Sequence, residues 1–387
     1  MMMKKWIAVL GLATAGFAVS SANAQESVKI GLTGALTGPV AGTYAPAVEG
    51  LRLYIDKVNA AGGVDGKPIE LLIQDDGAEP SKAAANAKRF LTQDDVAMMI
   101  NSSLSSTYAP TIAEAKRNGV PLLFAASVCP AEVFPPADPN LFCTTAFGAK
   151  YDSRAALSFI EDKSGADVKL GLHAMAIPVS RGEIDFAEEL GKEMGMTPVS
   201  KEITPPPTPD YTPFATNINN ADAEWVWSWA PWVAQIKTFE ALRRLGWEGD
   251  YLAYAHLEAE GELERVKDPE FFVVGANALF SEGLPVMADI TSAAEGSSYP
   301  ANQMTEGWIA GMVIEAALKA ASDPTSAESV REAMSNISVD MQGLRGGPLE
   351  WTADNHFRTQ QNYRVYRWNP DSGSIETVQD WTPFDVQ

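Results

Sequence analysis

The feature that most constrains the fold of this chain is a regular alternation of short apolar runs with longer amphipathic segments, one pair about every 25 to 30 residues. The segments between the runs carry apolar residues at helical spacing, such as Val48, Leu51 and Ile55. Alternation of this kind is typical of βαβ units built on a parallel sheet. In the first third of the chain it predicts strands over Val28–Leu32, Ile69–Gln74, Val96–Ile100 and Val120–Ala125.

The alternation stops once and then restarts, which divides the chain into two sets of elements. Residues 130–140 contain four prolines and are not expected to form a regular element. A second α/β set follows to about residue 276, and a late helix is expected over 304–320. A mature chain of about 363 residues exceeds a comfortable single core, so we expect two lobes. We assign residues 25–145 and 277–350 to lobe 1 and residues 146–276 and 351–387 to lobe 2, since the late helix most simply returns to the first set. The crossings would be hinges.

The first 24 residues have the pattern of a secretory signal peptide. Lys4 and Lys5 precede an apolar run over residues 6–19, and Ala22-Asn23-Ala24 supplies the small residues of a cleavage site. The run is shorter than the about 20 residues that span a bilayer. No cysteine stands directly after this run, which disfavours a lipid anchor. We therefore expect an exported, soluble protein in the periplasm of a Gram-negative bacterium.

The charge of the chain excludes two classes of partner. The formal net charge is −21, and removal of Lys4 and Lys5 lowers it to about −23. Nucleic acids and anionic membrane surfaces are bound by basic faces. Neither is therefore expected as a partner.

The two cysteines, Cys129 and Cys143, flank the proline-rich loop. In an exported protein we expect them to form a disulfide. The alternative is a catalytic or metal-binding thiol, but neither cysteine has a neighbouring histidine or a Cys-x-x-Cys partner.

The sequence contains no legible catalytic machinery. His173, His256 and His356 are widely separated, and no nucleophile elbow, P-loop or G-x-G-x-x-G motif follows a strand. The acidic pairs Asp75-Asp76 and Asp94-Asp95 are interpreted as solvated acids at element ends rather than as a catalytic dyad. We therefore expect a protein that holds a ligand without converting it, with no metal and no cofactor.

The expected ligand site lies beyond the carboxyl ends of the strands, as in other open parallel sheets. In the first lobe, Ser105, Ser106 and Thr107 occupy a turn between a strand and a helix. The positive end of the helix and its unpaired amides suit a carboxylate or phosphate there. The alternative is that Ser105 or Ser106 only caps the helix.

In the second lobe the strand ends are aromatic. Trp225, Trp227 and Trp229 alternate along one strand and so share a face. Most of this ladder is expected in the core, while Trp229 and Trp232 at its end could line a pocket. Arg181 follows the preceding strand and could bind a carboxylate in a forked geometry, although it could equally be a surface residue at a helix start.

In order and spacing, four short motifs resemble the type I periplasmic solute-binding proteins of the branched-chain amino acid (leucine/isoleucine/valine-binding) family. They are Val28-Lys29-Ile30-Gly31 with Leu36-Thr37-Gly38-Pro39, then Asp56–Gly63, then Ser105-Ser106-Thr107, and finally Val120-Pro121-Leu122-Leu123. The resemblance covers essentially the whole mature chain. It implies two Rossmann-like lobes with parallel central sheets, three hinge crossovers, a monomer, and delivery of a ligand to the membrane permease of an ABC transporter.

The resemblance also implies the positions that contact the ligand. In the family the serine turn and the next strand end hold the carboxylate, and help hold the ammonium, of an amino acid. These positions correspond here to Ser105 and Ser106, and to Ala125, Ala126 and Ser127. An aromatic residue at the end of the first glycine-rich loop corresponds to Tyr44.

Three departures from the family pattern bear on the ligand. Residues 178–181, including Arg181, replace a tyrosine segment; Trp229 and Trp232 replace tyrosines; and Glu258 is only the nearest counterpart of the acid that meets the ammonium. These changes favour a larger or aromatic carboxylate, with the ammonium left open. We expect the serines to hold the carboxylate and Tyr44 and the tryptophans to enclose the apolar part. A sensory receptor of the same fold or a periplasmic enzyme are the alternatives.

Overall fold

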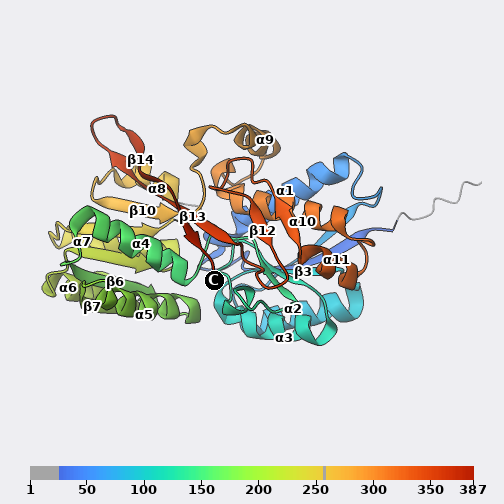
Figure 1. The fold of residues 1–387 in the computed structure, drawn as a ribbon, viewed down its shortest axis with the longest axis horizontal. Coiled ribbons are helices and arrows are strands. Elements are labelled where there is room, and N and C mark those ends of the chain that lie inside the picture. Colours follow the sequence, from blue (N-terminus) through green and yellow to red (C-terminus); the bar gives the residue numbers. More distant parts are fainter. Residues whose placement is uncertain (1–25, 256–258) are drawn as a thin grey trace, which may run out of the picture.

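The computed structural model describes residues 26–255 and 259–387. The expected signal peptide and Glu258 lie outside these ranges. Two sheets stand side by side, each covered by helices on both faces (Figure 1). Within the described ranges, no helix is both long and apolar enough to cross a membrane.

The first sheet has five parallel strands in the order β2-β1-β3-β4-β5. Its strands are β1 (Val28–Gly34), β2 (Ile69–Asp75), β3 (Met98–Ser102), β4 (Leu122–Phe124) and β5 (Leu141–Cys143). One face is covered by α1 (Ala41–Ala60), α9 (Pro285–Ala293), α10 (Thr305–Ala320) and α11 (Ala327–Met334), and the other by α2 (Pro80–Arg89) and α3 (Tyr108–Asn118). β5, which follows the proline-rich segment, was not anticipated from the sequence, because three residues of strand carry little periodic signal. The helix α9 was not anticipated either.

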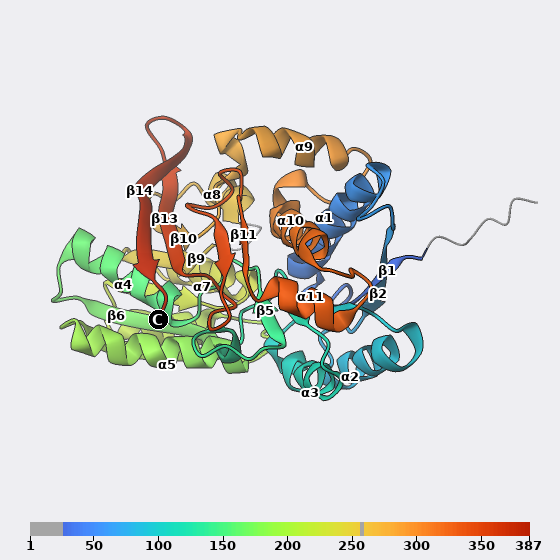
Figure 2. The same ribbon diagram turned by 45° about the vertical axis from the view of Figure 1, so that its right-hand side comes forward.

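The late helix α10 returns to the first lobe, as expected, and packs closely against α1 (Figure 2). A Cβ added to Gly307 of α10 would lie 1.7 Å from the carbonyl oxygen of Ala47 in α1. Only glycine lets the two backbones approach this closely. The contact closes the core that Leu51, Trp308 and Ile314 share with the apolar side chains of β1 and β3.

The second sheet has seven strands in the order β14-β13-β10-β9-β8-β6-β7. Its parallel strands are β6 (Lys169–Met175), β7 (Thr197–Thr204), β8 (Trp225–Trp229), β9 (Asp250–Tyr254) and β10 (Phe271–Gly275). The helices α4 (Lys150–Ser164) and α5 (Pro178–Glu193) cover one face, and α6 (Thr212–Asn220), α7 (Trp232–Arg244) and α8 (Ala259–Val266) cover the other.

The central strands are parallel, as expected, and one edge of this sheet is antiparallel. Strands β13 (Gln360–Asn369) and β14 (Ser374–Asp385) are antiparallel additions. β14 extends past Pro383, which is possible because it is an edge strand and its outer side needs no ladder amide.

The chain passes between the sheets three times, through segments 144–149, 276–279 and 352–359. A two-stranded sheet of β11 (Ile337–Val339) and β12 (Leu349–Trp351) precedes the third crossing. We keep the lobe boundaries expected from the sequence as our proposed division of the chain. The lobes touch: Tyr44 and Leu104 of the first lobe belong to the same buried cluster as Met175 and Ile177 of the second.

The expected disulfide is present between Cys129 and Cys143, whose Cα atoms are 5.7 Å apart. It ties the loop after β4 to the end of β5, directly before the first crossing. The hydroxyl of Thr145 lies against both sulfur atoms and accepts a hydrogen bond from the amide of Phe147. Through Thr145, the disulfide therefore supports the first residues of the crossing as well as the loop.

Removing this disulfide is expected to lower the free energy of unfolding by about 3 kcal/mol. The bond closes a loop across a 14-residue separation, and without it the unfolded chain gains conformational entropy of about that free energy. Urea unfolding of the Cys129→Ser/Cys143→Ser double variant measures the loss. Reductant should lower the stability of the native protein toward that of the variant and leave the variant unchanged. Equal stability of the two proteins without reductant would contradict the prediction.

Candidate ligand-binding site

The serine turn leads from β3 through the 3-10 helix η2 (Ser105–Thr107) into α3. One of its predicted hydroxyls, that of Thr107, and the hydroxyl of Ser127 after β4 are engaged in holding the backbone. Thr107 Oγ1 donates to the carbonyl of Leu104 at 2.8 Å and accepts from Asn101 Nδ2 at 3.1 Å. Ser127 Oγ donates to the carbonyl of Asn101 at 2.7 Å and accepts from the amide of Ser103 at 3.1 Å. Thr107 and Ser127 thus shape the turn from inside.

Asp76 supports the same turn from β2, and its expected solvated position was wrong. Its side chain is fully buried and accepts from Ser103 Oγ at 2.7 Å and from Thr33 Oγ1 at 2.9 Å. Burial raises the pKa of this carboxyl above its ordinary value. The ends of β2, β1 and β3 lie side by side, which brings Asp76 to the turn. Its neighbour Asp75 is exposed, as expected.

Ser105 has a different role from its neighbours. Its Oγ is buried and has no hydrogen-bond partner within residues 26–255 and 259–387. Neither η2 nor α3 begins with a side-chain cap, so the capping alternative does not account for this hydroxyl. A buried hydroxyl without a partner costs about 1–3 kcal/mol. Because η2 packs against α5 of the second lobe, Ser105 lies where the lobes meet.

The space between the lobes is narrow. A cavity of about 10 Å³ is bounded by Ala126 of the first lobe, Ala255 of the second, and residues of the first two crossings; its full lining is Thr43, Ala126, Ala146, Phe147, Ala255, Asn277 and Glu306. A second cavity of about 40 Å³ also contacts Ala255 and Asn277. Ala126 adopts a left-handed backbone conformation with φ 55°, and Ala125 before it faces the core of the first lobe.

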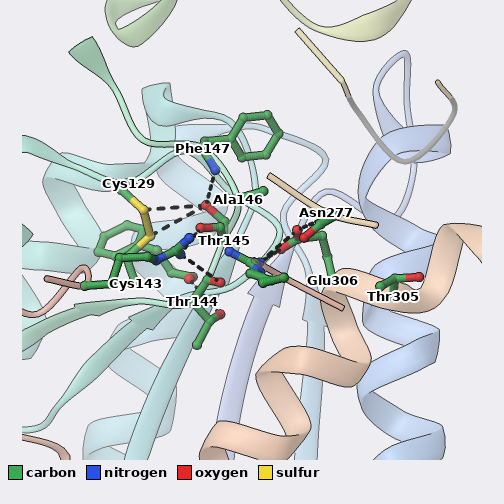
Figure 3. Close-up of polar contacts among 12 residues, drawn as sticks. Cys129, Cys143, Thr144, Thr145, Ala146, Phe147, Asn277, Thr305 and Glu306 are labelled. Carbon is green, nitrogen blue, oxygen red and sulfur yellow. Dashed lines mark hydrogen bonds and ion pairs between the residues drawn. A yellow bond between two sulfur atoms is a disulfide. The ribbon is translucent and has the colours of Figure 1, made fainter. Parts of the chain in front are cut away.

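Asn277 and Glu306, which contact each other (Figure 3), both line the first of these cavities. Asn277 Nδ2 donates to Glu306 Oε1, and Glu306 also accepts from Arg345 at 3.0 Å in a pair that is almost fully buried. The amide oxygen of Asn277 is buried without a hydrogen-bond partner among the described residues. It is therefore an available acceptor beside the carboxylate of Glu306.

The aromatic candidates and Arg181 are spread over several places. Trp232 is buried at the start of α7, with its ring 6.1 Å from that of Phe271. Tyr44 is buried in the cluster that includes Trp232. Trp229 points to the other face of the sheet, where its Nε1 donates to Asp152 at 3.0 Å. Arg181 is exposed on α5.

Trp229 contributes instead to a separate groove of about 420 Å³ at the lobe junction. This groove also contacts Cys129 and Phe134 of the first lobe, and Glu183 of α5. Glu183 accepts from the amide of Ser153 at 3.0 Å, and burial raises its pKa to about 7. Serine hydroxyls of the predicted turn do not line this groove.

The sequence reasoning missed Thr43, Phe147, Asn277 and Glu306. Asn277 follows β10, so the strand-end rule could have identified it. Glu306 lies on a helix far along the chain and carries no local signal. Within the described ranges, no three His, Cys, Asp or Glu residues are grouped as a metal would require.

Comparison with known proteins adds family information to this geometry. A family model described as periplasmic binding protein matches residues 27–374. The Leu/Ile/Val-binding protein homolog 7 of Brucella abortus (strain 2308) is 20% identical over 349 residues, which cover 86% of each chain. A leucine-, isoleucine-, valine-, threonine-, and alanine-binding protein of Pseudomonas aeruginosa is 34% identical over 119 residues, which span only 31% of that protein and 31% of this chain.

Two solved structures share the fold. A branched chain amino acid ABC transporter protein from Thermus thermophilus with bound valine superimposes with a TM-score of 0.80 at 18% identity, over 94% of this chain and 97% of that one. A solute binding protein from R. palustris in complex with benzoate gives a TM-score of 0.78 at 17% identity, over 94% and 98%. At these identities the likeness establishes the two-lobed architecture.

Proposed function

This chain belongs to the periplasmic binding protein family, and from that premise we propose that it is the ligand-binding component of an ABC uptake transporter. It binds a small carboxylate-bearing molecule between two lobes and passes it to a membrane permease, acting as a monomer without catalysis. The leader at residues 1–24 directs it to the periplasm. Relatives named for leucine, isoleucine and valine binding support this role.

The observation that carries the proposal is the buried hydroxyl of Ser105, which has no partner among the described residues and lies at a strand-to-helix turn between the lobes. A carboxylate placed there would accept from Ser105 and from the first amides of the helix, which have no intrahelical partner. Charged hydrogen bonds of this kind contribute about 1.5–3 kcal/mol each. Asp76 and Ser127 fix the turn in advance, so little ordering is needed when the ligand binds.

The acceptors that line the small cavity between the lobes favour an amino acid over a simple acid. The available oxygen of Asn277 and the carboxylate of Glu306 are suited to a donor such as an ammonium group. Phe147 supplies apolar surface to this cavity, and Tyr44 and Trp232 belong to the buried cluster that joins the lobes. The direction of Trp229 toward Asp152 removes one of the reasons for preferring an aromatic acid.

A thermal-shift and calorimetric panel of leucine, valine, phenylalanine, benzoate and 4-hydroxybenzoate tests the proposal. At least one amino acid should raise the melting temperature, since a bound ligand stabilises the folded state by RT ln(1 + [L]/Kd). Binding of the aromatic acids alone would exclude the ammonium contact and keep the binding role. Chemical conversion of any bound compound would contradict the binding-only role.

Ser105→Ala is expected to weaken binding of the best ligand by about 10- to 150-fold, which corresponds to about 1.5–3 kcal/mol. Calorimetric titration measures the change. Ser372→Ala, which removes an exposed hydroxyl on the turn between β13 and β14, is the matched control and should bind as the native protein does. Native affinity in Ser105→Ala would show that the carboxylate lies elsewhere.

A further inference from the structure

Two arginines are buried at the third crossing between the lobes. Arg345 lies just before β12 and is 7% exposed, and Arg358 lies just before β13 and is 3% exposed. Burial of a guanidinium is costly unless each of its donors is paired. The hydrogen bonds of these two side chains therefore have to be accounted for donor by donor.

Neither side chain has all of its donors paired within residues 26–255 and 259–387. Arg345 uses only Nη2, which donates to both carboxylate oxygens of Glu306 at 3.0 and 3.2 Å. Its Nε and Nη1 are buried with no partner within residues 26–255 and 259–387. Arg358 donates through Nη1 to Gln361 and through Nη2 to the carbonyls of Thr144 and Thr145. Its Nε is likewise buried and unpartnered among the described residues.

The charges of this cluster, as described, are not balanced either. Glu306 balances Arg345, whereas the described partners of Arg358 are neutral amide oxygens and the ring of Phe357, 4.1 Å from the guanidinium carbon. Burial and the nearby charge of Arg345 lower the pKa of Arg358, but a guanidinium does not lose its proton in proteins. A second positive charge is thus left without a described counter-charge.

Asp152, the other buried carboxylate of this region, does not supply that charge. It accepts from Tyr363 at 2.5 Å, from Trp229 at 3.0 Å and from the amide of Gly148 at 2.9 Å. Burial raises its pKa well above the ordinary value, which favours the neutral carboxyl. Within residues 26–255 and 259–387 it forms no hydrogen bond with either guanidinium.

A small cavity lies between the two arginines. Its volume is about 10 Å³, and Arg345 and Arg358 line it together with Gly346, Gly347, Gln361 and Asn362, among others. A cavity of this size holds one water-sized occupant. Gly346 packs closely against Asn362 in this lining, because a Cβ added to it would lie 2.6 Å from Cβ of Asn362.

We propose that this cavity is a binding site for a monatomic anion, chloride under physiological conditions, held by Arg345 and Arg358. The anion accepts from the unpartnered N–H groups of both side chains and supplies the missing negative charge. Arg358 itself joins the third crossing to the carbonyls of the first, and the bound anion adds Arg345, in the loop before β12, to this link. The site is separate from the proposed ligand cleft and does not depend on the identity of that ligand.

Thermal unfolding of the full mature protein without organic ligand tests the site. Sodium chloride is titrated against sodium gluconate at constant ionic strength, so that screening is unchanged. Chloride should raise the melting temperature saturably, by roughly 2 °C or more, because only the folded protein forms the site. Bromide should substitute for chloride, and crystals grown in sodium bromide should show an anomalous peak between the two guanidinium groups.

Two variants separate the site from general salt effects. Arg358→Gln should lose the chloride-dependent shift, while Arg367→Gln, which removes a partly exposed arginine of β13 that pairs with Glu376, should keep it. If Arg358→Gln does not fold, the bromide experiment on the native protein decides. Equal melting temperatures in chloride and gluconate, or crystals without a bromide peak at this position, would overturn the proposal and leave water as the occupant.

Discussion

Glu306→Ala is expected to lower the free energy of unfolding by about 3–5 kcal/mol, among the largest effects of a single substitution in this chain. Removing one partner of a buried ion pair leaves the other charge without compensation. Here Arg345 would lose its only described acceptor, beside the second buried cation Arg358. Asn277 would also lose the oxygen that orients its amide. Urea unfolding with linear extrapolation measures the loss.

Two comparisons make this prediction specific. Glu332→Ala removes an exposed carboxylate of α11, so it should change stability by no more than about 0.5 kcal/mol. Glu306→Gln/Arg345→Met should recover part of the loss, because a neutral pair leaves no unbalanced charge from this bridge. Equal losses in Glu306→Ala and Glu332→Ala would mean that the bridge is not formed in solution.

The second large effect is expected from pH through His173. This imidazole is fully buried in β6, where Nδ1 lies 2.7 Å from Ser228 Oγ and Nε2 lies 3.2 Å from Thr238 Oγ1. Burial lowers its pKa from 6.5 to about 3. Below pH 6.5 the unfolded chain therefore binds a proton that the folded protein excludes. The contribution of His173 is present above pH 6.5 and is lost as the pH falls toward 3, by roughly 2–3 kcal/mol between pH 7 and 4.5.

The effect has to be measured as a difference, because other groups act in the opposite direction. The pKa values of Glu183 and Asp250 are raised to about 7, so their contributions increase as the pH falls from 7 to 4.5. Subtracting the pH dependence of His173→Gln from that of the native protein isolates the histidine. Thr238→Val is the control, since it removes a partner of the imidazole and keeps the titrating group. Parallel curves for the native protein and His173→Gln would contradict the prediction.

The sequence-based site hypotheses differ in how well they anticipated the structure, and the difference is physical. The position of the serine turn follows from strand order, because the ends of adjacent parallel strands share one edge. The direction of each hydroxyl in that turn does not follow. Thr107 of the turn and Ser127 after β4 point inward to Asn101, whereas Ser105 Oγ has no described partner. Which hydroxyl is available depends on neighbouring strands that the local sequence does not contain.

The sequence by itself determined the α/β architecture, the return of the late helix and the pairing of Cys129 with Cys143. The order of the elements can be read from local periodicity, and the disulfide follows from two cysteines in a chain with an export signal. The tertiary structure alone decided the polar groups at the hinge. Asn277, Glu306 and Arg345 come from separate segments and meet only after the chain has crossed between the sheets. Their contacts depend on long-range packing, and no residue pattern within any one of those segments records it.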